Sequence, residues 1–294
     1  MGNKSDELLP EMSFWGHIDA LRKVLLRIAL VVVIITSLFF TFMNDIFDQI
    51  ILAPCRGDFV LYRVFNLITS KIPLLPDFST TGFHVELINI QLASQFFIHM
   101  TTSFWLGVVF SFPIIIYMLW GFIKPALYNG EQRGVKKVFF FGNIMFYIGI
   151  AIGYFVVFPV TLRFLAEYQV SEMVPNQISL DSYMDNFLVM IFIMGLIFEL
   201  PLVAWALSSI GILKRNFFRK YRRHAIVVLL IFAAVITPTG DPFTLMVVFL
   251  PLYGLFEASA YFVKPAPPEE PEEDETPDDP DNDDGLHYIP HYKK

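Results

Sequence analysis

One carboxylate, Glu199, stands inside an apolar run of this chain, within the sequence Gly195-Leu-Ile-Phe-Glu-Leu-Pro201. The run is long enough to cross a bilayer, and Glu199 falls about 12 residues, or ~18 Å, from its outer end. A charged side chain at that depth costs roughly 2.5–3.5 kcal/mol, so it must face protein or a water-filled cavity. Glu199 is either a protonated group bonded to a neighbouring helix or to the carbonyl that Pro201 frees, or a polar or titrating group of a transport surface.

A second carboxylate, Glu131, lies with Arg133 between two apolar runs, just after Pro125-Ala-Leu-Tyr-Asn129. Acidic residues at a membrane surface are usually only solvated. The alternative is a binding role, because a carboxylate can hold the planar fork of a guanidinium group by two parallel hydrogen bonds.

Four other polar residues have ordinary explanations at the ends of apolar runs. Arg22 is typical of a basic anchor, and Arg163 of a side chain that snorkels to the interface. Asp241 precedes Pro242, a favoured first helical residue, and is expected to cap that helix. His99 is expected to be a hydrogen-bonded helix residue rather than a ligand.

Six apolar runs must position these residues, and each is predicted to form a transmembrane helix. About 20 residues cross ~30 Å of hydrocarbon at 1.5 Å per residue. The fifth run, with 13 residues, is short. It needs shielding by neighbours, snorkelling by Arg222 and Arg223, or a thinned bilayer. The predicted spans are 24–42, 99–121, 138–160, 184–207, 225–237 and 243–262.

Basic residues alternate between the loops that these spans define. Of the 21 Lys and Arg, 16 fall in the N-terminal segment, the second and fourth loops and the C-terminal segment, and Arg27 lies at the start of the first span. Only four cations fall in the other loops: Arg56, Arg63, Lys71 and Arg163. Because cytoplasmic loops carry an excess of Lys and Arg, both ends of the chain are predicted to be cytoplasmic.

The composition excludes an ordinary soluble domain, since 55% of the residues are hydrophobic and 32 are Phe. A single cysteine, Cys55, cannot form an internal disulfide and argues against a cysteine-based metal site. The sequence contains no glycine-rich phosphate loop, no zinc-binding helix motif and no nucleophile elbow. We therefore expect no enzyme activity, no cofactor and no metal.

The net charge of −7 comes from the C-terminal segment 264–294, which holds 11 of the 28 acidic residues. The rest of the chain has 18 basic and 17 acidic residues, so no nucleic-acid partner is expected. Pro, Glu and Asp dominate from Pro265 to Leu286, a composition that cannot offset its ordering entropy. We predict a six-span membrane domain over 1–263 and a disordered acidic cytoplasmic tail over 264–294.

Two segments between or before the spans are predicted to be ordered. Residues 11–23 have an apolar stripe typical of an amphipathic helix that lies on the cytoplasmic surface. Residues 43–95 form a long external loop with three prolines, including Pro54. Its high apolar content indicates that it packs over the external end of the bundle.

The order and spacing of several dispersed strings resemble the Tat C subunit of the twin-arginine protein translocase. The resemblance runs from His17 to about Val263. Each string is weak alone, and their common order makes the match specific. The strings are His17-Ile-Asp-Ala-Leu-Arg-Lys23, Phe122-Ile-Lys-Pro-Ala-Leu-Tyr128, Phe146-Tyr-Ile-Gly149, Tyr154-Phe-Val-Val-Phe-Pro159, Phe198-Glu-Leu-Pro201, Thr237-Pro238 and Pro251-Leu-Tyr-Gly-Leu-Phe-Glu257.

The resemblance implies an all-α integral membrane protein: six transmembrane helices in a glove-like bundle with cytoplasmic N and C termini. It implies a receptor, in the bacterial cytoplasmic (inner) membrane, for folded precursors whose signal peptides carry paired arginines. It also implies an oligomeric Tat complex with single-span Tat A and Tat B partners, driven by the proton-motive force.

By the same resemblance, Glu131 matches the carboxylate that contacts the arginine pair, supported by Phe122 and Arg133. Arg22 matches the basic residue of the N-terminal element. Glu199 matches the intramembrane glutamate on the concave face.

Pro54 and Asp241 match positions in the first and third external loops. One position departs from the family, which usually has Glu where this chain has Ala20. Asp19 is acidic but offset by one residue, about 100° around a helix. Either Asp19 substitutes for that carboxylate or Glu131 acts largely alone.

Two other functions were weighed against the receptor. A proton-coupled small-molecule carrier would use Glu199 as its titrating group, but it would also need repeat symmetry and further buried polar partners. The third function is a membrane-embedded enzyme or structural scaffold, and the sequence shows no catalytic constellation for the enzyme.

Overall fold

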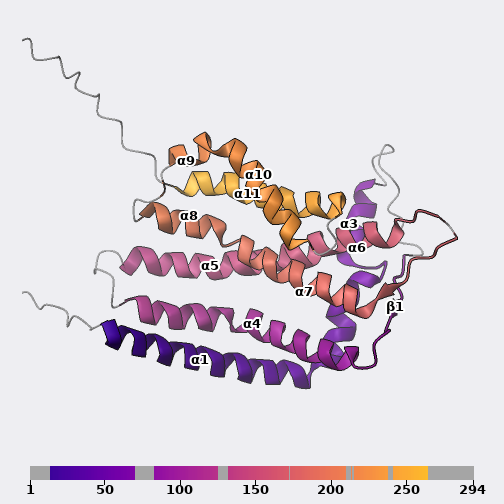
Figure 1. Ribbon diagram of the computed structural model, residues 1–294, viewed down its shortest axis with the longest axis horizontal. Coiled ribbons are helices and arrows are strands. Elements are labelled where there is room, and N and C mark those ends of the chain that lie inside the picture. The colour runs from indigo at the N-terminus through magenta and orange to yellow at the C-terminus, as the bar shows by residue number, and fades with distance from the viewer. Residues whose placement is uncertain are drawn as a thin grey trace, which may run out of the picture.

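Helices lying side by side make up most of the molecule in the computed structural model (Figure 1). The structure describes residues 14–69, 83–124, 132–171, 173–209, 213, 215–237 and 241–263. Glu131 and the predicted tail 264–294 lie outside these ranges. The first described helix begins, and the last ends, at the same end of the bundle (Figure 1).

The apolar runs form long helices, as predicted. Two of the predicted helices are interrupted: the third span, at η4 (Gly153–Val157), and the fourth span, between α7 (Leu180–Ile197) and α8 (Leu200–Ser209). The helix α5 (Gln132–Ile152) continues through a π-helical turn, η4 (Gly153–Val157), into α6 (Phe158–Glu167). Pro159 has no N–H to donate to the preceding turn, which accounts for the π-helical geometry there. The other long helices are α1 (Phe14–Thr41), α4 (Ser94–Ile123), α7 (Leu180–Ile197), α8 (Leu200–Ser209), α10 (Arg222–Ile236) and α11 (Pro242–Phe262).

Within the described residues, five helical segments are long and apolar enough to cross a membrane: Ile18–Thr41, Ser94–Phe122, Phe139–Glu167, Leu180–Ser208 and Pro242–Tyr261. They coincide with five of the six predicted spans, so the all-α membrane fold is confirmed. The fifth predicted span corresponds to α10, whose 15 residues give it a length of about 22 Å. The division into a membrane domain and a tail stays a prediction.

The expected surface helix over 11–23 is wrong as a separate element. Residues 14–23 form the first turns of α1, which continues without a break to Thr41. No proline interrupts α1, and an ion pair between Asp19 and Lys23 spans one turn at the predicted boundary. The amphipathic start and the apolar run are therefore one long helix.

Glycine allows α5 and α7 to pack closely. A Cβ on Gly149 would lie 2.5 Å from the Met194 carbonyl oxygen, and a Cβ on Gly195 would lie 2.9 Å from the Phe146 ring. Phe146 is fully buried and stacks on Phe112 of α4, with 3.7 Å between ring centres. Small residues at such crossings allow helix backbones to approach in a bilayer.

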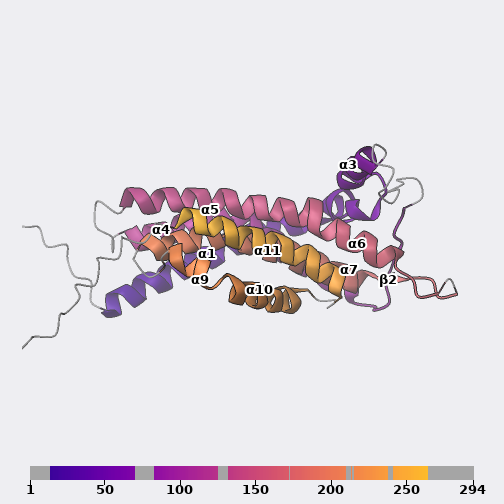
Figure 2. The ribbon, with the colours of Figure 1, turned by 90° about the horizontal axis from the view of Figure 1, so that it is seen from above.

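The external loop 43–95 folds onto one end of the bundle, as predicted for its described part. It contains α2 (Met43–Ile46), η1 (Phe47–Ile51), η2 (Ala53–Cys55) and α3 (Val60–Thr69). Figure 2 shows α3 at one end of the bundle, on the side where α5 lies, whereas α10 lies on the other side. A short parallel pair, β1 (Leu87–Ile88) and β2 (Ile178–Ser179), joins this loop to the segment before α7.

Candidate functional site

Three helix ends that carry predicted site residues meet at one end of the bundle. Figure 1 shows the start of α1, the end of α4 and the start of α5 together at the end opposite α3. The helices α1 and α4 pack against each other, as do α4 and α5. This end therefore brings together Asp19, Arg22, Phe122 and Arg133 by their positions in the helices.

The side chains near the start of α1 are exposed. Asp19 forms an ion pair with Lys23, with 2.7 Å between Oδ2 and Nζ. Both side chains are more than half exposed, so solvent screens the pair and it contributes little to stability. The Asp19 carboxylate is therefore available to a stronger cationic partner, and Arg22 is also exposed.

The second part of this end is the connection between α4 and α5. Phe122 is half-buried in the last turn of α4, and Arg133 is the second residue of α5. Glu131 immediately precedes Gln132, the first residue of α5, and lies outside the described residues. An acidic residue is favourable at a helix N-terminus because of the exposed N–H groups there.

Glu199 lies at a break between α7 and α8 rather than within a continuous helix. Its carbonyl accepts from the N–H groups of Leu202 and Val203, at 3.0 Å each, and so begins α8. Pro201 follows in the first turn of α8, where a missing N–H is tolerated. The proline and this new turn together account for the interruption of the predicted fourth span.

The Glu199 carboxyl group lies against α5, at a position where α5 has no side chain. A Cβ built on Gly142 would be 3.0 Å from Glu199 Oε2 and 3.5 Å from Oε1. Oε1 of Glu199 is buried and has no hydrogen-bond partner among the described residues. Oδ1 of Asn143, next to Gly142 in α5, is also buried and without such a partner. An unsatisfied buried acceptor costs about 1–3 kcal/mol. A proton or a donor from another molecule would remove that cost.

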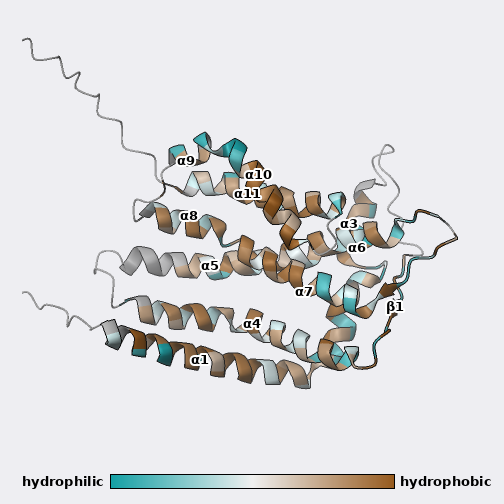
Figure 3. Cartoon of the chain, in the orientation of Figure 1, coloured by the Kyte–Doolittle hydropathy of each residue, from teal (hydrophilic) through white to brown (hydrophobic). Residues whose placement is uncertain are grey.

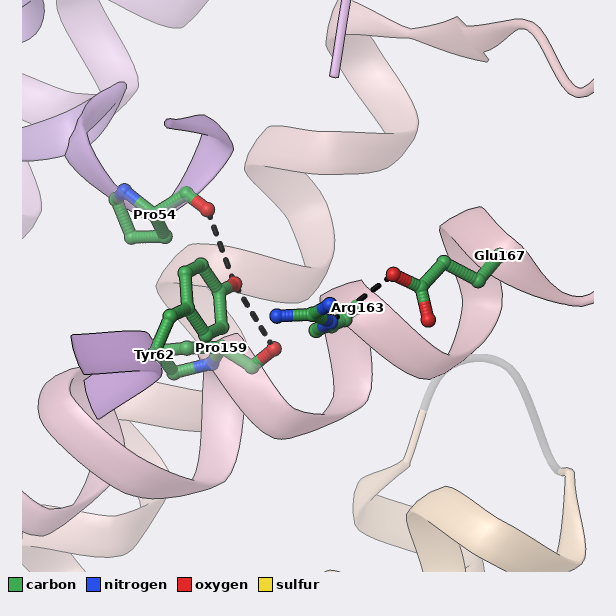
Figure 4. Close-up of polar contacts among 5 residues, drawn as sticks. All are labelled: Pro54, Tyr62, Pro159, Arg163 and Glu167. Carbon is green, nitrogen blue, oxygen red and sulfur yellow. Dashed lines mark hydrogen bonds and ion pairs between the residues drawn. The ribbon is translucent and has the colours of Figure 1, made fainter. Parts of the chain in front are cut away.

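At the other end of the bundle, Pro54 belongs to a tightly packed cap formed by η2, α3 and the first turns of α6, which we call the external cap because its loop is predicted to be external. Pro54 is buried. The Tyr62 hydroxyl, also buried, lies 3.0 Å from the Pro54 carbonyl oxygen and 3.1 Å from that of Pro159 (Figure 4). A hydroxyl has one proton to donate, so the two carbonyls share it.

The prediction that Arg163 snorkels to the interface is wrong. Arg163 is only 7% exposed, and its guanidinium lies against both the Tyr62 and the Phe83 ring, 5.3 and 5.0 Å from their centres. Its Nε donates to Glu167 Oε1 at 3.0 Å (Figure 4). The folded loop covers the arginine, so its charge is balanced by protein rather than by water.

Sequence reasoning missed Tyr62 as a member of this cap. Phe59 and Tyr62 lie three residues apart at the start of α3 and are both buried. That spacing places them on one face of a helix, which was the available signal. Burial raises the pKa of the Tyr62 hydroxyl, so it remains a neutral donor.

Two local predictions are confirmed. The Asp241 side chain accepts from Thr244 N at 2.7 Å and caps α11, with Pro242 as the first helical residue. His99 Nε2 lies 2.9 Å from the Phe40 carbonyl oxygen, and its ring stacks on Phe40. The first contact fixes the start of α11, and the second joins the start of α4 to the end of α1.

Comparison with known proteins gives one consistent result. The family profile described as "Sec-independent protein translocase protein (TatC)" matches residues 16–251. The TatC of Blattabacterium is 36% identical over 253 residues, covering 85% of this chain and 94% of that protein. The TatC of Escherichia coli K12 is 32% identical over 246 residues, covering 84% and 86%.

Solved structures agree. A crystal structure described as the twin-arginine translocase receptor TatC superposes with a TM-score of 0.64 at 27% identity, covering 84% of this chain and 97% of that one. A second, in the detergent DDM, gives 0.66 at 26% identity, covering 84% and 99%. The chain therefore belongs to the TatC family of Sec-independent protein translocase proteins and is a multi-pass membrane protein of the Tat system.

Proposed function

We propose that this protein is the receptor subunit that binds twin-arginine signal peptides and supports export of folded proteins. The observation that carries the proposal is the meeting of α1, α4 and α5 at one end of the bundle (Figure 1). It groups residues that sequence resemblance assigns to signal binding, although Asp19 and Arg22 are about 100 positions or more from Phe122 and Arg133. The solved relatives are described as twin-arginine translocase receptors.

This end of the bundle faces the cytoplasm in the proposal. Arg22, Lys23 and Lys124 are described at this end, whereas the opposite end has Arg56, Arg63 and the buried, ion-paired Arg163. An excess of exposed cations is typical of cytoplasmic ends. A precursor would therefore meet Glu131 and Asp19 before it is translocated.

The chemistry of recognition follows from the acceptors at this end. Arginine remains charged and presents a planar fork of donors, whereas lysine is a compact ammonium. Glu131, placed directly before α5, would accept from one guanidinium in a bidentate pair. Asp19 would exchange its weak pair with Lys23 for the second arginine. Phe122 would offer an apolar surface beside the site, and Arg22 and Arg133 would orient the carboxylates.

Glu199 has a different role in the proposal. Its buried Oε1, with no partner among the described residues, is suited to accept a hydrogen bond from a single-span partner of the Tat A or Tat B type. Such a contact forms within the membrane, where no water competes. It would act after signal binding, during assembly of the complex in which the proton-motive force drives transport.

The test is crosslinking of a precursor to Glu131→Ala. A precursor with paired arginines carries a photo-crosslinker beside the pair, and a paired-lysine precursor sets the background. We expect the variant to lower the arginine-specific yield to that background. Glu86→Ala, an exposed acid in the external loop, is the matched control. Wild-type yield with Glu131→Ala would refute the proposed site.

A further inference from the structure

The short helix α9 (Arg215–Lys220) and the start of α10 form a basic surface at the proposed cytoplasmic end of the bundle. Figure 3 shows hydrophilic residues gathered there on otherwise apolar helices. Between 214 and 224 the sequence holds six Lys and Arg and no acid. Among the described residues of this segment, Lys220, Arg222 and Arg223 have exposed side chains.

One acid of α11 meets this surface, and its carboxylate is already occupied. Glu257 Oε2 accepts from Arg222 at 2.6 Å, and its Oε1 accepts from the Tyr253 hydroxyl at 3.0 Å. Lys220 and Arg223 form no ion pair with any residue that the structure describes. The surface therefore keeps an uncompensated positive charge.

The chain leaves the bundle beside this surface. Val263, the last described residue, is 3% exposed and packs in one apolar cluster with Ala204 and Phe218 of α9. Phe218 also contacts the Phe256 ring, with 5.2 Å between ring centres, and so fixes α9 against α11. The anchor of the C-terminal segment and the basic surface are therefore neighbours.

The segment that follows has the complementary charge. Residues 269–284 contain 11 Asp and Glu, and the first of them is six positions after Val263. Six residues span at most about 20 Å, whereas α9, with six residues, is only ~9 Å long. The acidic residues can thus reach all of α9, and so short a tether gives an effective concentration on the order of millimolar.

We propose that the acidic segment 269–284 binds the basic surface formed by Lys220, Arg223 and their neighbours on α9 and α10 of the same chain. Charge complementarity and the position of Val263 favour this occupant over others. Bound there, the segment neutralises the surface and withholds it from anionic lipid headgroups. The inference concerns a different surface from the signal site and stands or falls independently of it.

Zero-length carbodiimide coupling of the purified full-length protein tests the proposal, because it joins a lysine amine to a carboxylate only when they touch. We expect mass spectrometry to find tail crosslinks concentrated at Lys214 and Lys220. Lys23, Lys136 and Lys137 serve as internal controls at the same end of the bundle. Raising salt from about 0.1 M to 1 M, which shortens the screening length from about 10 to 3 Å, should lower the yield at least about fivefold.

Two variants sharpen the test. Arg223→Glu should lower coupling at Lys220, since it reverses a neighbouring charge. Replacing the six acids 269, 270 and 272–275 by Gln and Asn should also lower coupling at Lys220, and it leaves the sequence of α9 unchanged. Unchanged coupling in both variants, or crosslinks spread evenly over all the lysines, would overturn the proposal.

Other occupants would give distinct results. Crosslinks between isotopically labelled and unlabelled chains would show that the tail binds a second copy rather than its own chain. Tail crosslinks that persist in phosphatidylcholine nanodiscs but vanish on adding phosphatidylglycerol would assign the surface to lipid. Either outcome would overturn binding within one chain in the membrane.

Discussion

The guanidinium of Arg163 lies 5.3 Å from the centre of the Tyr62 ring, and this contact joins two segments about one hundred residues apart in the sequence. The Tyr62 hydroxyl reaches the carbonyls of Pro54 and Pro159, so the same two residues connect η2, α3 and α6. The external cap is thus held by a buried cation, two aromatic rings and one shared proton.

Arg163→Met should loosen this cap. Methionine fills much of the volume but loses the ion pair with Glu167 and the contacts with two rings. A desolvated cation–π contact is worth about 2 kcal/mol. We expect a lower melting temperature in detergent and faster proteolysis of the external loop. Arg63→Met is the matched control, because its pair with Asp58 is exposed and should contribute at most about 1 kcal/mol. Equal effects of the two changes would contradict the assigned role.

The thiol of Cys55 can be used to measure whether the same cap is closed, and this needs no substitution. It is 4% exposed, and burial raises the pKa of its thiol from the ordinary 9.0 to about 11. Between these values the unfolded chain ionises while the folded chain does not, so stability is present below pH 9.0 and is lost as pH rises toward about 11.

We therefore expect maleimide to label Cys55 slowly in the folded protein at neutral pH and fully after denaturation. Arg163→Met should accelerate labelling if the cap opens. Rapid labelling of the native protein would show that the thiol is accessible and that the cap is not closed.

Local signals explain which features could be predicted from the sequence. The apolar runs predicted the helices, since hydropathy is a property of a continuous segment. The pair Asp241-Pro242 predicted a helix cap, since capping also depends on residues that are adjacent in the sequence. Arg163 was mispredicted because its burial depends on Tyr62 and Phe83, which only the folded loop brings to it. Pro201 could have indicated the helix break at Glu199. The continuous apolar run around it favoured a single uninterrupted helix instead.

The proposed signal-binding site rests on resemblance rather than on a local sequence pattern. Nothing in the periodicity of α1 or α5 indicates that Asp19 and Arg133 belong together. Only the packing of α1 on α4 and of α4 on α5 brings their ends to one place. A constellation assembled from separate helix ends has no fixed spacing in the sequence.

Gly149→Ala should destabilise the bundle much more than Gly254→Ala. A Cβ on Gly149 would meet backbone atoms of α7, 2.5 Å from the Met194 carbonyl oxygen, whereas nothing lies within 4 Å of a Cβ on Gly254. Overpacking costs about 1–3 kcal/mol, while an open helical glycine gains up to about 1 kcal/mol as alanine. Thermal unfolding of the two variants in one detergent measures the difference. Similar melting temperatures would refute the close approach of α5 and α7.

Ala20→Glu should preserve or increase binding of twin-arginine precursors. It places a carboxylate at the position where relatives of this family usually have one, and Ala20 lies on an accessible helix start. Asp19→Asn should weaken binding in the parent protein but have less effect in the Ala20→Glu background. Precursor crosslinking in this double-mutant cycle gives the comparison. Complete loss of binding in Ala20→Glu would show that α1 is aligned wrongly with the family.

Glu199→Ala should separate signal binding from the later steps of transport. Glu199 lies at the break between α7 and α8, and Gly142 of α5 faces its carboxyl group. Removing the carboxyl group eliminates the buried acceptor without disturbing the helix ends that carry Asp19 and Phe122. We expect near-normal precursor crosslinking but reduced crosslinking to a Tat A or Tat B partner and reduced export.

Gly142→Ala gives an independent version of the same experiment. Its Cβ would lie 2.6 Å from the flexible end of Leu202 and 3.0 Å from Glu199 Oε2, so it should displace the carboxyl group while leaving it present. It should therefore reproduce part of the partner defect. Glu199→Gln, which keeps the size and an acceptor oxygen, should retain partner binding if hydrogen bonding is the role of this residue. Full export by well-expressed Glu199→Ala would remove Glu199 from the mechanism, because no other described residue supplies an acidic acceptor at that break.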